Sequence, residues 1–173
     1  MTANSQPLSA GRIAFVILAL ALGGFAIGTT EFAAMSLLPF YAADFAITEP
    51  VAAHAVSAYA LGVVVGAPIL GLFGANWPRR HLLVVLMVLI ALGNAATVMA
   101  PGYYALLAFR FLSGLPHGAY FGVAALLAAS LMPERRAAAA SYVMAGLAVA
   151  TVIGAPLRLT TPAADGLAVS RPM

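Results

Sequence analysis

The chain alternates between long apolar stretches and short polar connectors. Each stretch has roughly the 20 residues that an α-helix needs to cross a membrane. The predicted spans are residues 13–41, 51–73, 82–99, 104–131 and 137–157. The pattern therefore predicts an all-α membrane protein with about five transmembrane helices in a domain of residues 13–157. An N-terminal segment of residues 1–12 precedes this domain, and a divergent polar tail of residues 158–173 follows it.

Basic residues occupy alternate connectors. The arginines near the ends of the spans are Arg12, Arg79, Arg80, Arg135 and Arg136. The connector after the first span carries Asp44 and Glu49 instead. Because positively charged loops are retained in the cytoplasm, we expect a cytoplasmic N-terminus, cytoplasmic second and fourth connectors, and an outward-facing acidic connector.

The composition excludes several classes of protein. Hydrophobic residues make up 64% of the chain and charged residues 8%, and the mean hydropathy is +1.03, which would leave a soluble domain with too little polar surface. Cysteine is absent, and His54, His81 and His117 are widely separated, so no metal-ligand spacing is present. No arginine run exceeds two residues, so we expect a lipid bilayer as the surroundings and no nucleic acid, metal or cofactor.

Glycines recur at four-residue spacing within three of the spans. The pairs and triplets are Gly24 with Gly28, Gly62 with Gly66, and Gly114 with Gly118 and Gly122. Such spacing lets helix backbones approach closely in lipid. The general interpretation is helix packing, and only the glycines placed beside charged residues say more.

Glu31, Arg110 and His117 are ionisable residues that lie well inside the apolar spans. Glu31 follows Gly24 and Gly28 along one helix face, and Arg110 shares a face with His117. At about 1.5 Å per residue, Glu31 lies about 15 Å inward from Tyr41, whereas Arg110 and His117 lie about 9 and 20 Å inward from Tyr104. We therefore expect Glu31 to face Arg110 or His117 across a cavity and to form a proton pathway, because charges at membrane depth are costly and usually functional. The alternative is a fixed ion pair that only orients two helices.

Enzyme motifs are missing from the sequence. Ser113 and His117 share a helix face, but no G-x-S-x-G elbow and no third triad member accompany them. Neither phosphate-binding pattern, G-x-x-x-x-G-K-[ST] or G-x-G-x-x-G, occurs, so we expect neither an enzyme nor an ATP-driven pump. The aromatic residues Tyr59, Tyr120 and Phe121 fit either a polyspecific pocket or ordinary membrane packing.

The ordered motifs resemble those of the major facilitator superfamily, and in particular its sugar-efflux and multidrug proton antiporters. The string GTTEF at residues 28–32, followed by LLP at 37–39, is similar to the opening helix of the arabinose-efflux-permease-like group. The string RFLSGLPHG at 110–118 resembles the fourth-span motif, whose arginine the family associates with proton transfer. The resemblance implies a role for Arg110 in proton transfer, and together with the depths of the three residues it leads us to expect that Glu31, Arg110 and His117 carry proton coupling.

Two further segments match the family in part. Residues 71–80 take the place of its signature loop, with Gly71, Arg79 and Arg80 present, but with Ala75 where aspartate is common and Pro78 where glycine is common. Gly154 and Pro156 resemble the antiporter motif of the fifth helix. In that motif proline shapes the helix, because it removes a backbone hydrogen bond. The resemblance runs from about residue 12 to 157.

The resemblance implies most of the N-terminal six-helix half of a twelve-span carrier in a bacterial-type inner membrane. We expect a truncated secondary transporter that exchanges protons for a sugar-like or drug-like solute, with a frameshifted or divergent tail after residue 157. The partner we expect is a chain that supplies the missing helices, because alternating access needs both halves. The competing hypothesis is a non-transporting membrane fragment that binds other helices through its glycine faces and is inactive without a partner.

Overall fold

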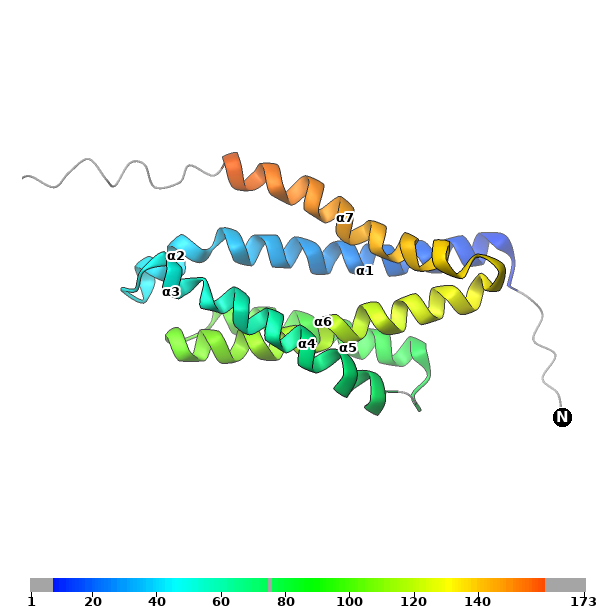
Figure 1. Cartoon of the computed structure of the whole chain (residues 1–173), viewed down its shortest axis with the longest axis horizontal. Helices are drawn as coiled ribbons and strands as arrows, with labels where there is room; N and C mark the ends of the chain where they lie inside the picture. Colours follow the sequence, from blue (N-terminus) through cyan, green and yellow to red (C-terminus); the bar gives the residue numbers. More distant parts are fainter. Residues whose placement is uncertain (1–7, 75, 161–173) are drawn as a thin grey trace, which may run out of the picture.

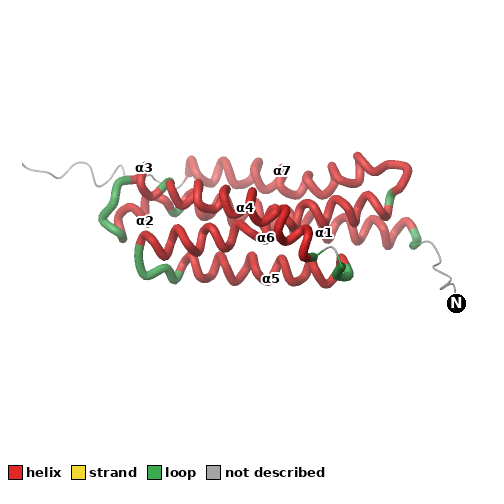
Figure 2. The backbone as a smooth tube through the Cα atoms, turned by 60° about the horizontal axis from the view of Figure 1, so that its bottom comes forward, coloured by secondary structure: helices red, strands yellow, loops and turns green. Residues whose placement is uncertain are grey.

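The computed structural model describes residues 8–74 and 76–160, and within them every regular element is helical. Figures 1 and 2 show long helices that run back and forth along one axis. The elements are α1 (Ala10–Ser36), α2 (Leu38–Asp44), α3 (Glu49–Ala52), α4 (His54–Phe73), α5 (Arg79–Val98), α6 (Tyr103–Leu131), the 3₁₀ turn η1 (Pro133–Arg135) and α7 (Arg136–Thr160).

Five of these helical segments are long and apolar enough to cross a membrane. They cover residues 10–36, 49–73, 79–98, 103–131 and 133–153. These segments agree with the five predicted spans to within a few residues, except at the end of the first. The all-α membrane architecture is therefore confirmed, and α7 continues to Thr160, three residues into the predicted tail.

The first apolar run is not one continuous helix. It breaks at Leu37, and Pro39 lies in the first turn of the following helix, α2. Proline has no backbone N–H to donate to the preceding turn, which explains a break at this point. Glu31 consequently lies five residues, about 7.5 Å, from the end of α1, and the depth counted from Tyr41 along an unbroken helix is wrong.

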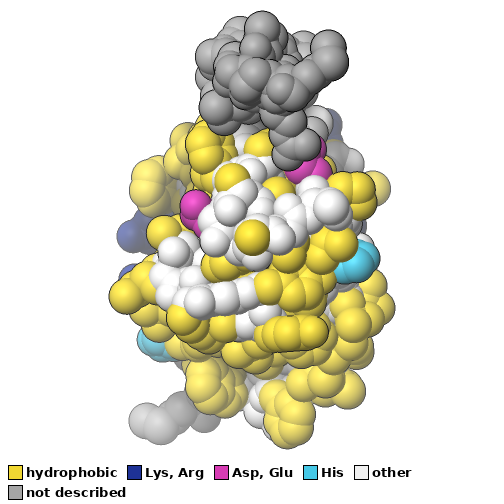
Figure 3. Space-filling view, turned by 90° about the vertical axis from the view of Figure 1, so that its left-hand side faces the viewer, with side chains coloured by type: hydrophobic (Ala, Val, Ile, Leu, Met, Phe, Trp, Pro, Cys, Tyr) yellow, Lys and Arg dark blue, Asp and Glu magenta, His cyan; other side chains and the backbone are white. Residues whose placement is uncertain are grey.

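Charged connectors separate to the two ends of the bundle. Successive spans run in opposite directions, so the start of α1, the α4–α5 connector and η1 share one end, and α2 and α3 lie at the other (Figure 1). We call these the arginine end, with Arg12, Arg79, Arg80, Arg135 and Arg136, and the acidic end, with Asp44 and Glu49. Figure 3 looks at the acidic end and shows acidic side chains on an otherwise mostly apolar surface.

Helix α6 is the centre of the bundle. It packs against α4, α5 and α7, whereas α1 packs mainly against α7. In the most apolar 18-residue stretch of α6, 56% of residues are buried, compared with 17–28% in the corresponding stretches of the other four spans. The outer helices instead expose large apolar side chains such as Leu72, Phe73 and Val152, as expected for surfaces that face lipid.

Glycines bring the backbones of α4 and α6 into direct contact. A Cβ atom added to Gly62 would collide with the carbonyl oxygen of Phe111, and one added to Gly66 would collide with that of Leu115. From the other helix, a Cβ on Gly114 would collide with the carbonyl oxygen of Tyr59, and the Val63 oxygen lies 2.5 Å from the Cβ position of Gly118. This glycine seam confirms the close approach predicted from the four-residue spacing.

A second seam joins α1 to α7. A Cβ on Gly28 would lie 2.7 Å from the Cβ of Ala150, and one on Gly24 would lie 3.2 Å from the Val143 carbonyl oxygen. From the other helix, a Cβ on Gly146 of α7 would collide with the carbonyl oxygen of Ala21. Gly122 is different, because a Cβ there would meet nothing within 4 Å, so the third glycine of the α6 triplet plays no part in close packing.

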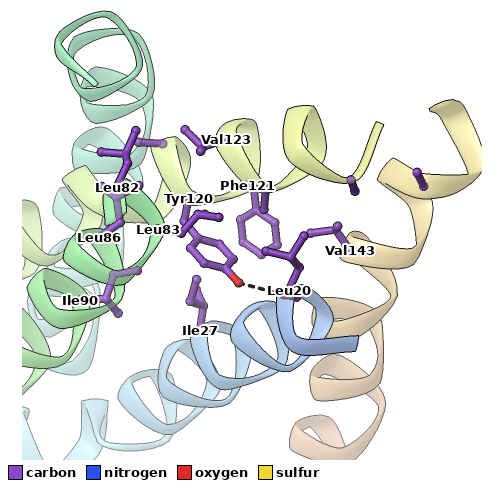
Figure 4. Packing of buried hydrophobic residues seen from close by; sticks show 14 residues of the cluster. Leu20, Ile27, Leu82, Leu83, Leu86, Ile90, Tyr120, Phe121, Val123 and Val143 are labelled. Carbon is purple, nitrogen blue, oxygen red and sulfur yellow. Dashed lines mark hydrogen bonds between the residues drawn. The ribbon is translucent and has the colours of Figure 1, made fainter. Parts of the chain in front are cut away.

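One hydrogen bond ties α1 to α6 within the apolar core. The Tyr120 hydroxyl donates to the backbone carbonyl of Leu20 over 2.9 Å (Figure 4). Tyr120 and Phe121 belong to the buried cluster together with residues of α1, α5 and α7. A Cβ on Gly23 would collide with the Tyr120 hydroxyl, so the absence of a side chain at Gly23 makes room for this bond.

Enlarging the α4–α6 seam should destabilise the bundle. We expect Gly114→Ala to lower the free energy of unfolding by about 1–3 kcal/mol, because the new methyl group meets backbone atoms that no rotamer change can move away. Gly122→Ala is the matched control on the same helix and should change stability little. Reversible unfolding in mixed micelles, followed by circular dichroism, measures both. Equal stability of the two variants would contradict the seam.

Candidate functional site

The guanidinium of Arg110 lies in the interior of the bundle against an aromatic ring. Arg110 is only 2% exposed, and its Cζ atom lies 4.2 Å from the centroid of the Tyr59 ring. A cation over the face of an aromatic ring is attracted by the ring quadrupole, more strongly when both groups are desolvated. The first contact of this intramembrane cation is therefore a tyrosine of α4.

The same tyrosine also binds His117. Its hydroxyl lies 2.6 Å from Nδ1 of His117, and both residues are buried, at 3% and 8% exposure. The rings meet edge to face, and Phe121 packs on the imidazole with a centroid distance of 5.2 Å. Tyr59 thus joins the two ionisable residues of α6.

Local geometry explains how this cluster assembles. Arg110 and His117 are seven residues apart, two helical turns, and project from one face of α6. Gly114 lies between them and contacts the backbone of Tyr59. The close approach of α4 at this glycine places the ring face of Tyr59 against Arg110 and its hydroxyl against His117.

Glu31 lies on another helix, α1. It is half-buried, and the hydroxyls of Thr29 and Thr30 next to it donate back to the carbonyls of Phe25 and Ile27 within the same helix. Glu31 is near enough to Arg110 for their charges to interact through space. Nη1 of Arg110 is nevertheless buried with no hydrogen-bond partner in the described part of the chain.

The expected pairing of Glu31 with Arg110 or His117 is therefore not a direct contact in this conformation. Tyr59 contacts both Arg110 and His117 instead. That Glu31 faces them across a cavity and forms a proton pathway with them stays a prediction.

The arginine end shows one contact of the predicted signature loop. Nη1 of Arg79 donates to the backbone carbonyl of Leu126 in α6 over 3.3 Å, which attaches the start of α5 to the central helix. Arg80 is exposed. A Cβ on Gly71 would meet nothing within 4 Å, so close packing does not require glycine there.

The remaining predicted positions lie near the C-terminus. Gly154 and Pro156 fall within the helical backbone of α7, but their side-chain surroundings lie outside what the structure describes. The tail from residue 161 onward also lies outside the described residues. Among residues 8–74 and 76–160, no three histidine, aspartate or glutamate side chains come together as metal ligands.

A separate cavity of about 550 Å³ opens between α1 and α7 at the arginine end. Its walls are apolar and include Ile13, Ile17, Met132 and Tyr142. None of Glu31, Arg110 and His117 lines it, so it is distinct from the buried cluster.

Sequence reasoning treated Tyr59 with the other aromatic residues and did not connect it to the charges. A signal existed, because Tyr59, Gly62 and Gly66 follow three- and four-residue spacing along α4 and so share the face that packs on α6. What the sequence lacked was the register between the two glycine pairs, which decides that Tyr59 lies level with Gly114.

Comparison with known proteins gives consistent matches. The family model described as Major Facilitator Superfamily matches residues 20–159. The chain is 42% identical over 146 residues to the inner membrane transport protein YdhP of Escherichia coli (strain K12), covering 84% of the chain and 38% of that protein. It is 43% identical to the putative transporter AraJ of the same strain, over 82% of the chain and 36% of AraJ.

A more distant relative is the chloramphenicol resistance protein of Streptomyces lividans, with 33% identity over 79% of the chain and 35% of that protein. No solved structure matches the chain. The chain thus spans well under half the length of each of these relatives. Five membrane-spanning helices, a family model that covers most of the chain and relatives above 40% identity lead to one conclusion: the chain belongs to the Major Facilitator Superfamily.

Proposed function

We propose that this chain provides the first five spans of a proton-coupled efflux carrier for a sugar-like or drug-like solute. Family membership supports a transporter rather than an enzyme. The names of the relatives support export, since one of them is a chloramphenicol resistance protein and another is described as a chloramphenicol efflux pump. The matched region of YdhP is 38% of that protein, so a carrier of that length needs further helices beyond the matched spans.

The observation that carries this proposal is the set of ionisable groups inside the bundle. Arg110 and His117 are buried on α6, and Glu31 is half-buried on α1 without filling the free hydrogen-bond position on Arg110. A fixed structural ion pair would satisfy both partners, because breaking or leaving open a buried pair is costly. A carboxylate that can exchange its proton, beside a cation that can neutralise its charge, fits a coupling site better than a structural ion pair.

In this proposal Glu31 takes up and releases the coupled proton. Arg110 stabilises the carboxylate when it is ionised, because an opposite charge nearby favours the charged form. His117 provides a second protonation site in the same cluster. Solute binding and proton binding then compete for one region, which is the basis of exchange.

The other predicted residues have supporting roles in this proposal. Arg79 and Arg80 hold the loop between α4 and α5 at the cytoplasmic side of an inner membrane, with Gly71 at the end of the preceding helix. Gly154 and Pro156 shape the last part of α7. The partner of these five spans is a chain or segment that supplies the remaining helices.

The second candidate function is a membrane fragment that binds other helices without transporting. Its support is that the chain matches only 35–38% of the length of YdhP, AraJ and the chloramphenicol resistance protein. Against it, Gly62, Gly66, Gly114 and Gly118 are already occupied by contacts within the chain, so these glycine faces are not free for an outside helix.

Transport is tested with the purified chain in proteoliposomes that enclose a pH-sensitive dye. A pH gradient is imposed, and sugars and chloramphenicol are added in turn, both to the chain alone and to the chain co-reconstituted with the remaining helices of YdhP. We expect solute-dependent proton flux when a complete set of helices is present. Absence of flux from both preparations for every solute would favour the non-transporting candidate.

Removing the carboxylate should uncouple transport. We expect Glu31→Gln to reduce solute-driven proton flux at least tenfold while helix content stays unchanged, because an amide cannot bind and release the proton. Glu49→Gln makes the same chemical change on the exposed acidic end and should leave flux intact. Retained flux in Glu31→Gln would remove Glu31 from the coupling site.

The absence of cysteine allows a direct test of orientation. We expect Thr48→Cys, between α2 and α3, to react with a membrane-impermeant thiol reagent in spheroplasts, because the acidic end faces outward. Ser9→Cys, at the start of α1, should react only after permeabilisation. The reverse labelling pattern would place the N-terminus outside.

A further inference from the structure

The Tyr59 side chain contacts both Arg110 and His117. Its ring face receives the guanidinium at 4.2 Å, and its hydroxyl meets Nδ1 of His117 at 2.6 Å. The proposed coupling scheme assigns no role to this tyrosine. Because Tyr59 contacts both residues, a change in the protonation of His117 can alter how the ring holds Arg110.

The Tyr59–His117 bond changes direction when His117 is protonated. A neutral imidazole can offer a bare Nδ1, to which the tyrosine hydroxyl donates, whereas a protonated imidazole carries hydrogen on both nitrogens and must donate from Nδ1 to the tyrosine oxygen. The hydroxyl hydrogen then has to turn away from His117. Protonation at this position therefore reorganises the tyrosine without breaking the contact.

Protonation also creates two cations on one tyrosine. Like charges at short range in a weakly screened interior repel strongly, and Tyr59 cannot hold Arg110 on its face as favourably once its hydroxyl partner is cationic. Glu31 is the carboxylate that acts on Arg110 from another helix, and Nη1 of Arg110 has no hydrogen-bond partner in the described chain. Displacement of the guanidinium from Tyr59 would therefore carry it toward Glu31.

The charged and titratable groups around His117 come from several helices. Arg110 and Tyr120 share its helix, Tyr59 on α4 contacts it, and Tyr41 on α2 and Glu31 on α1 act on the neighbouring Arg110. The basic residues at the starts of α5 and α7 lie at the arginine end of the bundle, at Arg79, Arg80, His81 and Arg136. Within the described part of the chain, the side-chain hydrogen bond of His117 is to Tyr59.

We propose that Tyr59 is a positioning residue that holds Arg110 on its ring while His117 is neutral and releases it toward Glu31 when His117 is protonated. The proposal rests on the proposed function, because it describes how the coupling site is regulated. It makes Tyr59 the link between protonation on α6 and charge neutralisation on α1. The release requires no covalent step and no added ligand.

The test is nitrogen NMR of the intact chain in lipid nanodiscs, with ¹⁵N-labelled histidine and arginine, across about pH 3 to 8, a range wide enough to include both protonation states of a buried histidine. His117→Gln and Arg110→Lys assign the signals. In the wild type, we expect the Arg110 side-chain resonance to move with the same midpoint as the His117 ring. An Arg110 resonance that ignores the His117 transition would overturn the proposal.

Three variants separate the two contacts of Tyr59. Tyr59→Phe keeps the ring but removes the hydroxyl, so we expect His117 to titrate while the displacement of the Arg110 resonance falls at least threefold. Tyr59→Leu removes the ring as well, so the Arg110 resonance should take its low-pH position at every pH. Tyr103→Phe is the matched control, because it removes a tyrosine–histidine bond of 2.8 Å to His54 at the acidic end and should leave Arg110 unaffected.

The variants also distinguish this inference from the proposed function. An undiminished Arg110 response in Tyr59→Phe would overturn the positioning role even if transport depends on Glu31. A response that persists in His117→Gln would assign it to another titrating group and would also overturn the role. The NMR measurement needs no solute, so absence of transport would leave the Tyr59 result intact and refute only the carrier proposal.

Discussion

The contact between the backbones of α4 and α6 is the constraint from which the site follows. Hydrophobic burial does not drive helices together in lipid as it does in water, so close packing and interhelical hydrogen bonds have to provide the association. Gly62 and Gly114 permit that packing because neither inserts a side chain. The same approach places Tyr59 against Arg110 and His117, so a rule of helix packing becomes the geometry of an ionisable cluster.

The bundle divides its ionisable groups between two glycine-packed helix pairs. Tyr59, Arg110 and His117 belong to the α4–α6 pair, whereas Glu31 belongs to the α1–α7 pair. Contact between α1 and α6 is slight in comparison, and the bond from Tyr120 to Leu20 is a prominent part of it. The acid and the cations are therefore near one another without being fixed to each other.

The sequence was sufficient for the architecture because long apolar runs and alternating arginines report a property that each span carries by itself. It also identified the glycine faces, since four-residue spacing is local. The break at Leu37 was missed because the residues on both sides are equally apolar, although Pro39 was visible. The partner of Arg110 was missed for another reason: Tyr59 is 51 residues away, and only the register between two helices brings them together.

The glycine seams have a mechanical consequence. An interface of backbone against backbone contains no rotamers to rearrange, so it resists deformation and transmits movement through the whole helix pair. The Tyr120–Leu20 bond is of the opposite kind, since a single hydroxyl can detach from one carbonyl and re-form its bond elsewhere. The architecture thus combines two rigid helix pairs with one hydrogen bond that can break and re-form. That bond lies between the helix that carries Glu31 and the helix that carries Arg110 and His117.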